Sequence, residues 1–251
     1  MRIRLQIVNE SPLLDDVEGA KIAKALQRQI DVQFRPTWGT AAKIEFVPRG
    51  SKADPNAWWI VATDDADQAG ALGYHDLTPA LLPVGKAFAK TTQEAGAEIS
   101  VTIGHETLEM LGDPWINRTV LDPRSGKLYA EENCDAVEAD EFGIEVEGVL
   151  LSDFVLPQFF DYNHARKGVK LSYGGHVTEP FEIARGGYLS FLDLRHVDEG
   201  WHQVGGERID AEEVAGVRPA GFPRGSRRER RRRLWSPHDR LRVSTVECGQ
   251  A

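Results

Sequence analysis

One segment of the chain, residues 104–114 with the sequence GHETLEMLGDP, constrains the fold more than any other. The pattern predicts a helix over about residues 98–111. Its end is signalled by Gly112, which suits a left-handed cap position, and by Pro114, which pushes Asp113 out of the helical region. The rest of the chain must therefore be arranged around one helix with a defined C-terminal end.

Three side chains of this helix carry the functional signal. His105 and Glu109 are four residues apart, so they lie on one face of the helix, one turn apart, and can bind a single ion. Glu106 projects toward the same rim. The spacing is that of the H-E-x-x-H metallopeptidase motif with the second His replaced by Glu. We therefore interpret the helix as a metal-binding element.

A second acidic cluster follows the helix after a loop. It contains Glu131, Glu132 and Asp135, and it lies about where a third metal ligand on a second helix is expected. Each of these residues alone also fits an acidic surface turn. The sequence indicates that at least one of them binds the ion, and it leaves the choice open.

At this point the sequence resembles the zincin metallopeptidases, specifically the gluzincin branch, over residues 101–138. The resemblance implies that His105 and Glu109 bind zinc, that Glu132 is the third ligand, and that Glu106 is the general base acting on the metal-bound water. One departure is Glu109 in place of the usual His. The other is that Glu131 or Asp135 can take the place of Glu132.

The Glu109 substitution has consequences for the metal. Two carboxylates and one neutral imidazole leave a divalent ion formally neutral, so bound water should be less acidic than the usual zinc-bound value of about 7. Zn²⁺ is the expected ion, and the additional oxygen ligand makes Ca²⁺, Mn²⁺ or Fe²⁺ competitors. If Asp135 joined as a fourth protein ligand, the site would be closed and structural.

The segments before the helix predict an α/β (α+β) domain in which a mixed sheet packs on the active-site helix. Alternating or continuous apolar residues indicate strands at residues 2–8, 43–48 and 58–63. Asp15 or Asp16 caps a helix after the first strand. The sequence also predicts an edge strand with a long loop at residues 70–92 and a strand at residues 144–151.

Charge divides the chain into two parts. Residues 218–251 contain 10 Arg and 3 acidic residues, a net charge of +7, against −16 for residues 1–217 and −9 for the whole chain. We predict a zincin-like metal-binding domain over residues 1–205 and a basic extension over residues 206–251. The Arg run at 227–233 lacks interleaved aromatic residues, which favours a solvated tail over a nucleic-acid-binding segment.

The composition, with 41% hydrophobic and 27% charged residues, is that of a globular protein rather than a fibrous or disordered one. The N-terminal apolar stretch is too short and too interrupted for a signal peptide or a membrane anchor, so we expect a cytoplasmic protein that does not bind membranes. Cys134 and Cys248 are too few and too far apart for a disulfide framework.

These observations lead to a first hypothesis of metal-assisted hydrolysis of a peptide or protein substrate, with Glu106 as catalytic base. The alternative is a catalytically silent zincin-like fold whose metal is structural and whose surface binds a partner. Several loop residues are also candidates for an oxyanion donor, although packing is the better interpretation of each. These are His75, His164, His176, Tyr162 and Tyr188.

Overall fold

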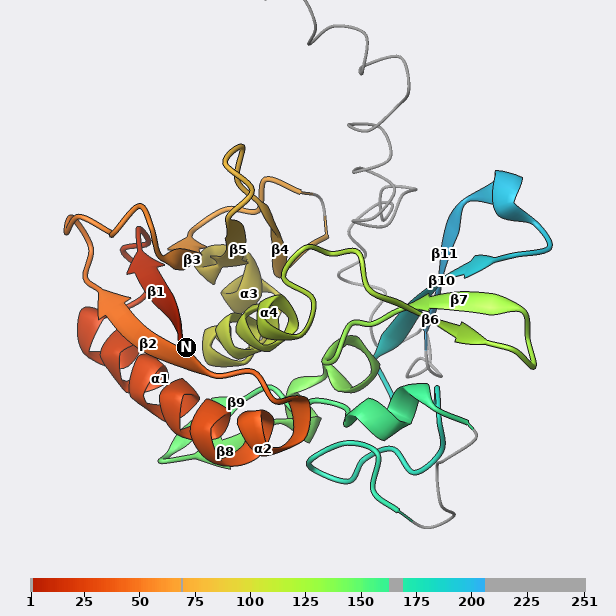
Figure 1. Cartoon of the computed structure of the whole chain (residues 1–251). Coiled ribbons are helices and arrows are strands. Elements are labelled where there is room, and N and C mark those ends of the chain that lie inside the picture. Colours follow the sequence, from red (N-terminus) through yellow and green to blue (C-terminus); the bar gives the residue numbers. More distant parts are fainter. Residues whose placement is uncertain (1, 69, 163–168, 206–251) are drawn as a thin grey trace, which may run out of the picture.

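The computed structural model describes residues 2–68, 70–162 and 169–205. Within them, five strands form a mixed sheet in the order β2-β1-β3-β5-β4 (Figure 1). The first four strands in this order are parallel, and β4 pairs antiparallel with β5 at the edge. The expected mixed α/β architecture is therefore confirmed. The strand bounds are β1 Ile3–Asn9, β2 Ala42–Val47, β3 Trp58–Thr63, β4 Gly73–Leu77 and β5 Pro83–Phe88.

Helix α1 (Asp16–Gln29) connects β1 to β2 and continues through a π-helical turn at Ile30–Phe34 into α2 (Arg35–Trp38). The Asp15 carboxylate accepts hydrogen bonds from the backbone N–H groups of Val17 and Glu18, so Asp15, and not Asp16, is the cap. The short helix α3 (Ala89–Glu94) follows β5 and precedes α4 (Ile99–Gly112), the helix with the metal-binding signal.

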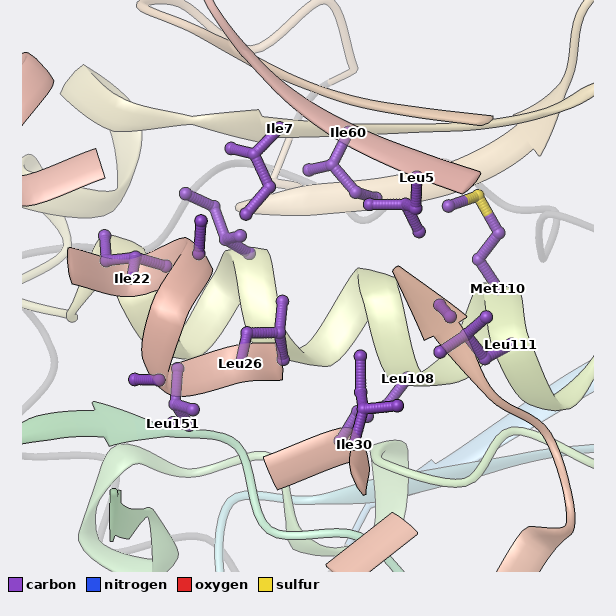
Figure 2. Close-up of a cluster of buried hydrophobic side chains, with 14 of the residues drawn as sticks. Leu5, Ile7, Ile22, Leu26, Ile30, Ile60, Leu108, Met110, Leu111 and Leu151 are labelled. Atoms are coloured by element: carbon purple, nitrogen blue, oxygen red, sulfur yellow. The ribbon is translucent and has the colours of Figure 1, made fainter. Parts of the chain in front are cut away.

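The main core lies between the sheet and the two long helices. Figure 2 shows Leu5, Ile7 and Ile60 of the sheet projecting toward these helices, with Leu26 of α1 and Leu108 of α4 among the side chains they meet. All five side chains are fully buried. Burying one such side chain contributes about 1.5–3 kcal/mol, so this contact fixes α4 against the sheet.

Many of the described residues after α4 pack around a separate apolar cluster, whereas Val146, Leu151 and Phe154 pack in the main core. Among the described residues after α4, four strands make an antiparallel sheet in the order β11-β10-β7-β6 (Figure 1). The strand bounds are β6 Thr119–Asp122, β7 Lys127–Ala130, β10 Tyr188–Asp193 and β11 Trp201–Gly205. Single 3-10 turns occur at Asp135–Val137, Asp140–Phe142, Pro157–Phe160 and Val197–Glu199.

The strand expected at residues 144–151 is instead a hairpin of two short strands, β8 (Ile144–Val146) and β9 (Val149–Leu151). Its turn is formed by Glu147 and Gly148, both with positive φ. A turn of this kind reverses the chain between two strands, and the apolar pattern alone gave no sign of it.

The role expected of Gly112 was wrong. Gly112 is the last residue of α4 rather than a left-handed cap, and the helix ends because Asp113 adopts φ −129° and ψ 72°. The reason for glycine is close packing, since a Cβ at Gly112 would overlap the Asn133 side-chain amide. That amide donates to the Leu108 carbonyl at 3.0 Å. The hydrogen bond holds residues 131–137, which contain Glu131, Glu132 and Asp135 and are called the acidic segment below, against the helix.

The predicted extension, residues 206–251, lies outside the described residues, so the domain boundary stays a prediction. None of the helices in the described part of the chain is both long enough and apolar enough to cross a membrane.

We predict that Gly112→Ala lowers the free energy of unfolding by about 1–3 kcal/mol, because the new methyl group displaces Asn133. The matched control is Gly104→Ala in the same helix, where the nearest atom to the added Cβ is the Ser152 backbone nitrogen at 3.3 Å. Urea unfolding of both variants tests this. A Gly112→Ala variant no less stable than Gly104→Ala would contradict the packing role.

Candidate metal centre

Helix α4 is buried along almost its whole length, including its polar residues. His105, Glu106 and Glu109 are 7%, 2% and 0% exposed. These three residues therefore do not lie on a solvated face of the helix. Because isolated buried charges are strongly disfavoured, such a group is retained only where its members compensate one another or bind an ion.

Glycine lets the helix approach the edge of the sheet. A Cβ at Gly73 of β4 would lie 2.8 Å from Glu106 Oε1 and 2.8 Å from Thr102 Cγ2. A Cβ at Gly85 of β5 would overlap the Ile60 side chain and would lie 3.6 Å from Glu106 Cβ of α4. The two glycines thus bring β4 and β5 close to the α4 turn that carries the functional residues.

One part of the site lies between α4 and the acidic segment. His105 Nε2 is 3.2 Å from Glu109 Oε1 and 3.3 Å from Asp135 Oδ1. The acidic segment is held in place by Asn133 and by the Cys134 backbone N–H, which donates to Glu109 Oε1 at 3.4 Å. Asp135 begins a 3-10 turn, where a second helix was expected.

The other part of the site contains a residue from the edge strand. His75 of β4 is 1% exposed, and its Nδ1 lies 3.5 Å from Glu106 Oε2 and 3.5 Å from Glu109 Oε2. Its Nε2 lies 4.0 Å from Glu132 Oε2. The site therefore joins strand β4, helix α4 and the acidic segment.

The acidic candidates differ in their partners. Glu131 pairs with Arg118 at 3.1 Å, while Glu132 is directed to His75 and Asp135 to His105. Glu132 and Asp135 are both buried. The geometry thus brings two of the three acidic candidates to the site, each beside a different histidine.

Buried His, Glu, Asp and Cys groups in the described residues lie close enough together to hold a metal ion. Three groups each present ligand atoms within 4.8 Å of one another. In these groups Glu132 occurs with His75, and His105 occurs with Asp135 or Cys134. The groups are His75, Glu109 and Glu132; His105, Glu109 and Cys134; and His105, Asp135 and Glu138.

The distances between the histidine nitrogens and the carboxylate oxygens fit side chains that bind the same metal ion. A charge-assisted N–H···O hydrogen bond is about 2.7–2.9 Å long, shorter than the 3.2–3.5 Å distances from His75 and His105 to Glu106, Glu109 and Asp135. Two ligands on one tetrahedral zinc with bonds of about 2.0–2.1 Å are roughly 3.3 Å apart. The donor set and its spacing therefore suit a divalent ion.

Inside the site, the histidines and the carboxylates stabilise one another's charged forms. Burial acts to lower the pKa of His75, but Glu106, Glu109 and Glu132 outweigh it and raise this pKa to about 10. Burial likewise opposes the charged form of His105, while Glu109 and Asp135 raise its pKa well above the usual value. Burial acts to raise the pKa of Glu109, and the two histidines hold it well below its usual range.

Cys134 is a fully buried free thiol beside the same carboxylates. Burial, followed by the charge of Glu109, raises its pKa well above the usual value. The Sγ atom donates a hydrogen bond to Asn133 Oδ1 at 3.1 Å. Without an ion the thiol is therefore protonated and is a poor ligand.

Sequence reasoning placed His75 among packing residues, although it lies inside the site. Its one sequence signal was a histidine in a strand next to Gly73, and strand pairing that brings it to α4 is not visible in the sequence. The other loop candidates are elsewhere. His176 is exposed and stacks on Phe142, Tyr162 packs on Phe181, and Tyr188 begins β10, while His164 lies outside the described residues.

No protein-family model, curated protein or solved structure matches this chain. The assignment of a function therefore rests on the chemistry of the site.

We predict that the metal-free protein loses stability as the pH rises. The pKa of His75 is 6.5 in the unfolded chain and about 10 in the folded one, so its contribution is complete below pH 6.5 and lost on rising to about pH 10. Urea unfolding between pH 6.5 and 9 should show a falling free energy of unfolding.

The His75→Asn variant should flatten this pH dependence. The exposed His196, changed to Asn in the same way, is the control and should leave the slope unchanged. Equal slopes in the wild type and in His75→Asn would contradict the assignment.

Proposed function

We propose that this protein is a metal-dependent hydrolase with a zincin-like arrangement of its active-site helix. The observation that carries the proposal is the buried group in which His105 and Glu109 share one face of α4 and Glu106 lies beside them. The ion would be held by His105, by Glu109 and by one acidic residue of the segment 131–137. Glu132 is the ligand that the zincin resemblance implies, and Asp135 is the acidic residue nearest to His105.

A divalent ion in this position would supply Lewis acidity toward a scissile carbonyl and would lower the pKa of a water molecule. The chain itself supplies the proton transfer. The Glu106 carboxylate would accept the proton of the attacking water and later deliver it to the leaving amine. Burial of the whole group excludes bulk water, which strengthens each of these interactions.

The surroundings of Glu106 support this proposed role. Its Oε2 atom lies 3.5 Å from His75 Nδ1, and its Oε1 atom lies against Gly73 of the edge strand. Two neighbouring elements therefore limit where the carboxylate can move. A general base must be held within hydrogen-bond reach of its proton donor, and this packing limits the orientations that Glu106 can adopt.

An extended peptide is the substrate class that the architecture favours. The edge strand β4 pairs with β5 along one side, and it carries His75 directly to the centre. A peptide lying along this strand would run past the catalytic residues.

Zn²⁺ remains the ion we propose, since it accepts imidazole and carboxylate ligands in tetrahedral sites. Carboxylates outnumber histidines in the group, which also suits Mn²⁺ or Fe²⁺. Ca²⁺ is the weakest of the competitors, because it takes six to eight oxygen ligands and no imidazole.

A second candidate function is a catalytically silent zincin-like fold in which the ion only stabilises the folded domain. The observation in its favour is the number of donors around His105, with Glu109 and Cys134 in one group and Asp135 in another. If all four bound one ion, no position would remain for water or substrate.

The Glu106→Gln variant separates the two functions. We expect it to retain the ion and to lose hydrolysis by at least a factor of about 100, because an amide cannot accept the proton of the water. Metal content and turnover of a casein or peptide-library substrate are measured together. Glu94→Gln, an exposed change on α3, is the control and should keep full turnover.

Turnover by Glu106→Gln equal to that of the wild type would exclude the general-base role. A wild-type protein that holds its ion and cleaves none of the library peptides would favour the silent fold.

We also predict that His105→Ala loses the ion and becomes less stable than the wild type, because an ion that binds only the folded chain stabilises it. Elemental analysis and thermal unfolding with and without a chelator check this. The chelator should lower the Tm of the wild type and leave the Tm of His105→Ala unchanged. A variant with wild-type metal content would remove His105 from the site.

A further inference from the structure

The two histidines of the centre contact opposite ends of one carboxylate. His105 Nε2 lies 3.2 Å from Glu109 Oε1, and His75 Nδ1 lies 3.5 Å from Glu109 Oε2. Glu109 is 0% exposed, and it occurs in two of the ligand groups described above. The geometry points to a centre for two divalent transition-metal ions bridged by Glu109, which deepens the proposed function and rests on it.

Each ion would have its own histidine, and the two ions would share Glu109. The first would lie beside His105, whose Nε2 is 3.2 Å from Glu109 Oε1 and 3.3 Å from Asp135 Oδ1. The second would lie beside His75, with Glu109 and Glu132 completing a group whose ligand atoms are within 4.8 Å of one another. A bridging carboxylate places two ions about 3.5–4 Å apart, the spacing of known two-metal hydrolytic centres.

Carboxylates face both nitrogens of His75. Its Nε2 faces Glu132 Oε2 at 4.0 Å, which is too long for a hydrogen bond but can be spanned by an ion between the two atoms. Its Nδ1 lies 3.5 Å from Glu106 Oε2 and 3.5 Å from Glu109 Oε2. Metal-bound histidines commonly donate their second N–H to a carboxylate, so Glu106 would orient the ligand and stay outside the coordination shell.

Charge balance favours two ions over one. Four carboxylates are buried around the two imidazoles, those of Glu106, Glu109, Glu132 and Asp135. With one divalent ion beside His105 and a proton on His75, this group carries a charge of −1, whereas two divalent ions beside neutral imidazoles leave it neutral. Since uncompensated buried charge is strongly disfavoured, the second ion stabilises a group of this composition.

The two-ion centre also explains why the sheet edge is packed so closely on α4. His75 reaches Glu109 because Gly73 and Gly85 allow β4 and β5 to approach the helix. Imidazole and carboxylate donors together suit Zn²⁺, Mn²⁺ and Fe²⁺. We therefore assign the second position to the same class of ion as the first.

The test uses the full-length protein loaded with Zn²⁺, dialysed against metal-free buffer and measured by elemental analysis. We expect two ions per chain in the wild type and one in His75→Asn. The matched control is His196→Asn, an exposed histidine with a side chain 59% accessible, which should retain two. One ion per chain in both the wild type and His75→Asn would overturn the second ion and leave the proposed function intact.

A spectroscopic measurement on the wild type makes the test independent of how well any variant folds. Loading with Mn²⁺ should give the electron paramagnetic resonance spectrum of an exchange-coupled pair when two equivalents are bound. Two uncoupled Mn²⁺ signals would overturn the bridge. Absence of any bound ion in both measurements would overturn the two-ion centre together with the proposed function.

Discussion

The contact between Glu109 and two buried histidines is the interaction on which the rest of the site depends. Glu109 is fully enclosed, so its negative charge must be compensated by His105 on the same helix and by His75 on the edge strand. This contact connects the two parts of the centre. Loss of either histidine would leave a buried carboxylate with less compensation.

The fold supplies this arrangement through two separate packings. Apolar side chains of the parallel strands fix α4 beneath the sheet, and the edge hairpin then carries His75 over the helix. On the other side of α4, Asn133 binds the Leu108 carbonyl and brings Glu132 and Asp135 to the centre. Helix α4, strand β4 and the acidic segment meet at the site. Glycines at positions 73, 85 and 112 leave room for the neighbouring side chains and backbone.

Much of this was accessible from the sequence, and the reasons for success and failure are physical. The strands of the parallel sheet were found because their apolar residues follow a local pattern, and the position of α4 was found from its motif and from Pro114. His75 was not recognised, since its place beside α4 depends on the antiparallel pairing of β4 with β5 and on the packing of the sheet. The role of Gly112 was missed because its partner, Asn133, lies in a distant segment.

The acidic residues illustrate the same limit. The position of Glu131, Glu132 and Asp135 after the helix predicted that at least one of them binds a metal. Neighbouring residues in a loop point in different directions, and only tertiary structure shows that Glu131 pairs with Arg118. The resemblance to zincins chose Glu132, whereas the acidic residue beside His105 is Asp135. The choice between them is a question of where an ion sits, and its position can be measured directly.

Anomalous diffraction from crystals of the zinc-loaded protein, recorded on both sides of the zinc absorption edge, is that measurement. The account predicts an anomalous peak in the buried group, about 2.0–2.1 Å from His105 Nε2 and within bonding distance of the Glu109 carboxylate. Crystals of zinc-loaded protein with no anomalous peak beside His105 and Glu109 would contradict the central claim that this cluster is a metal centre.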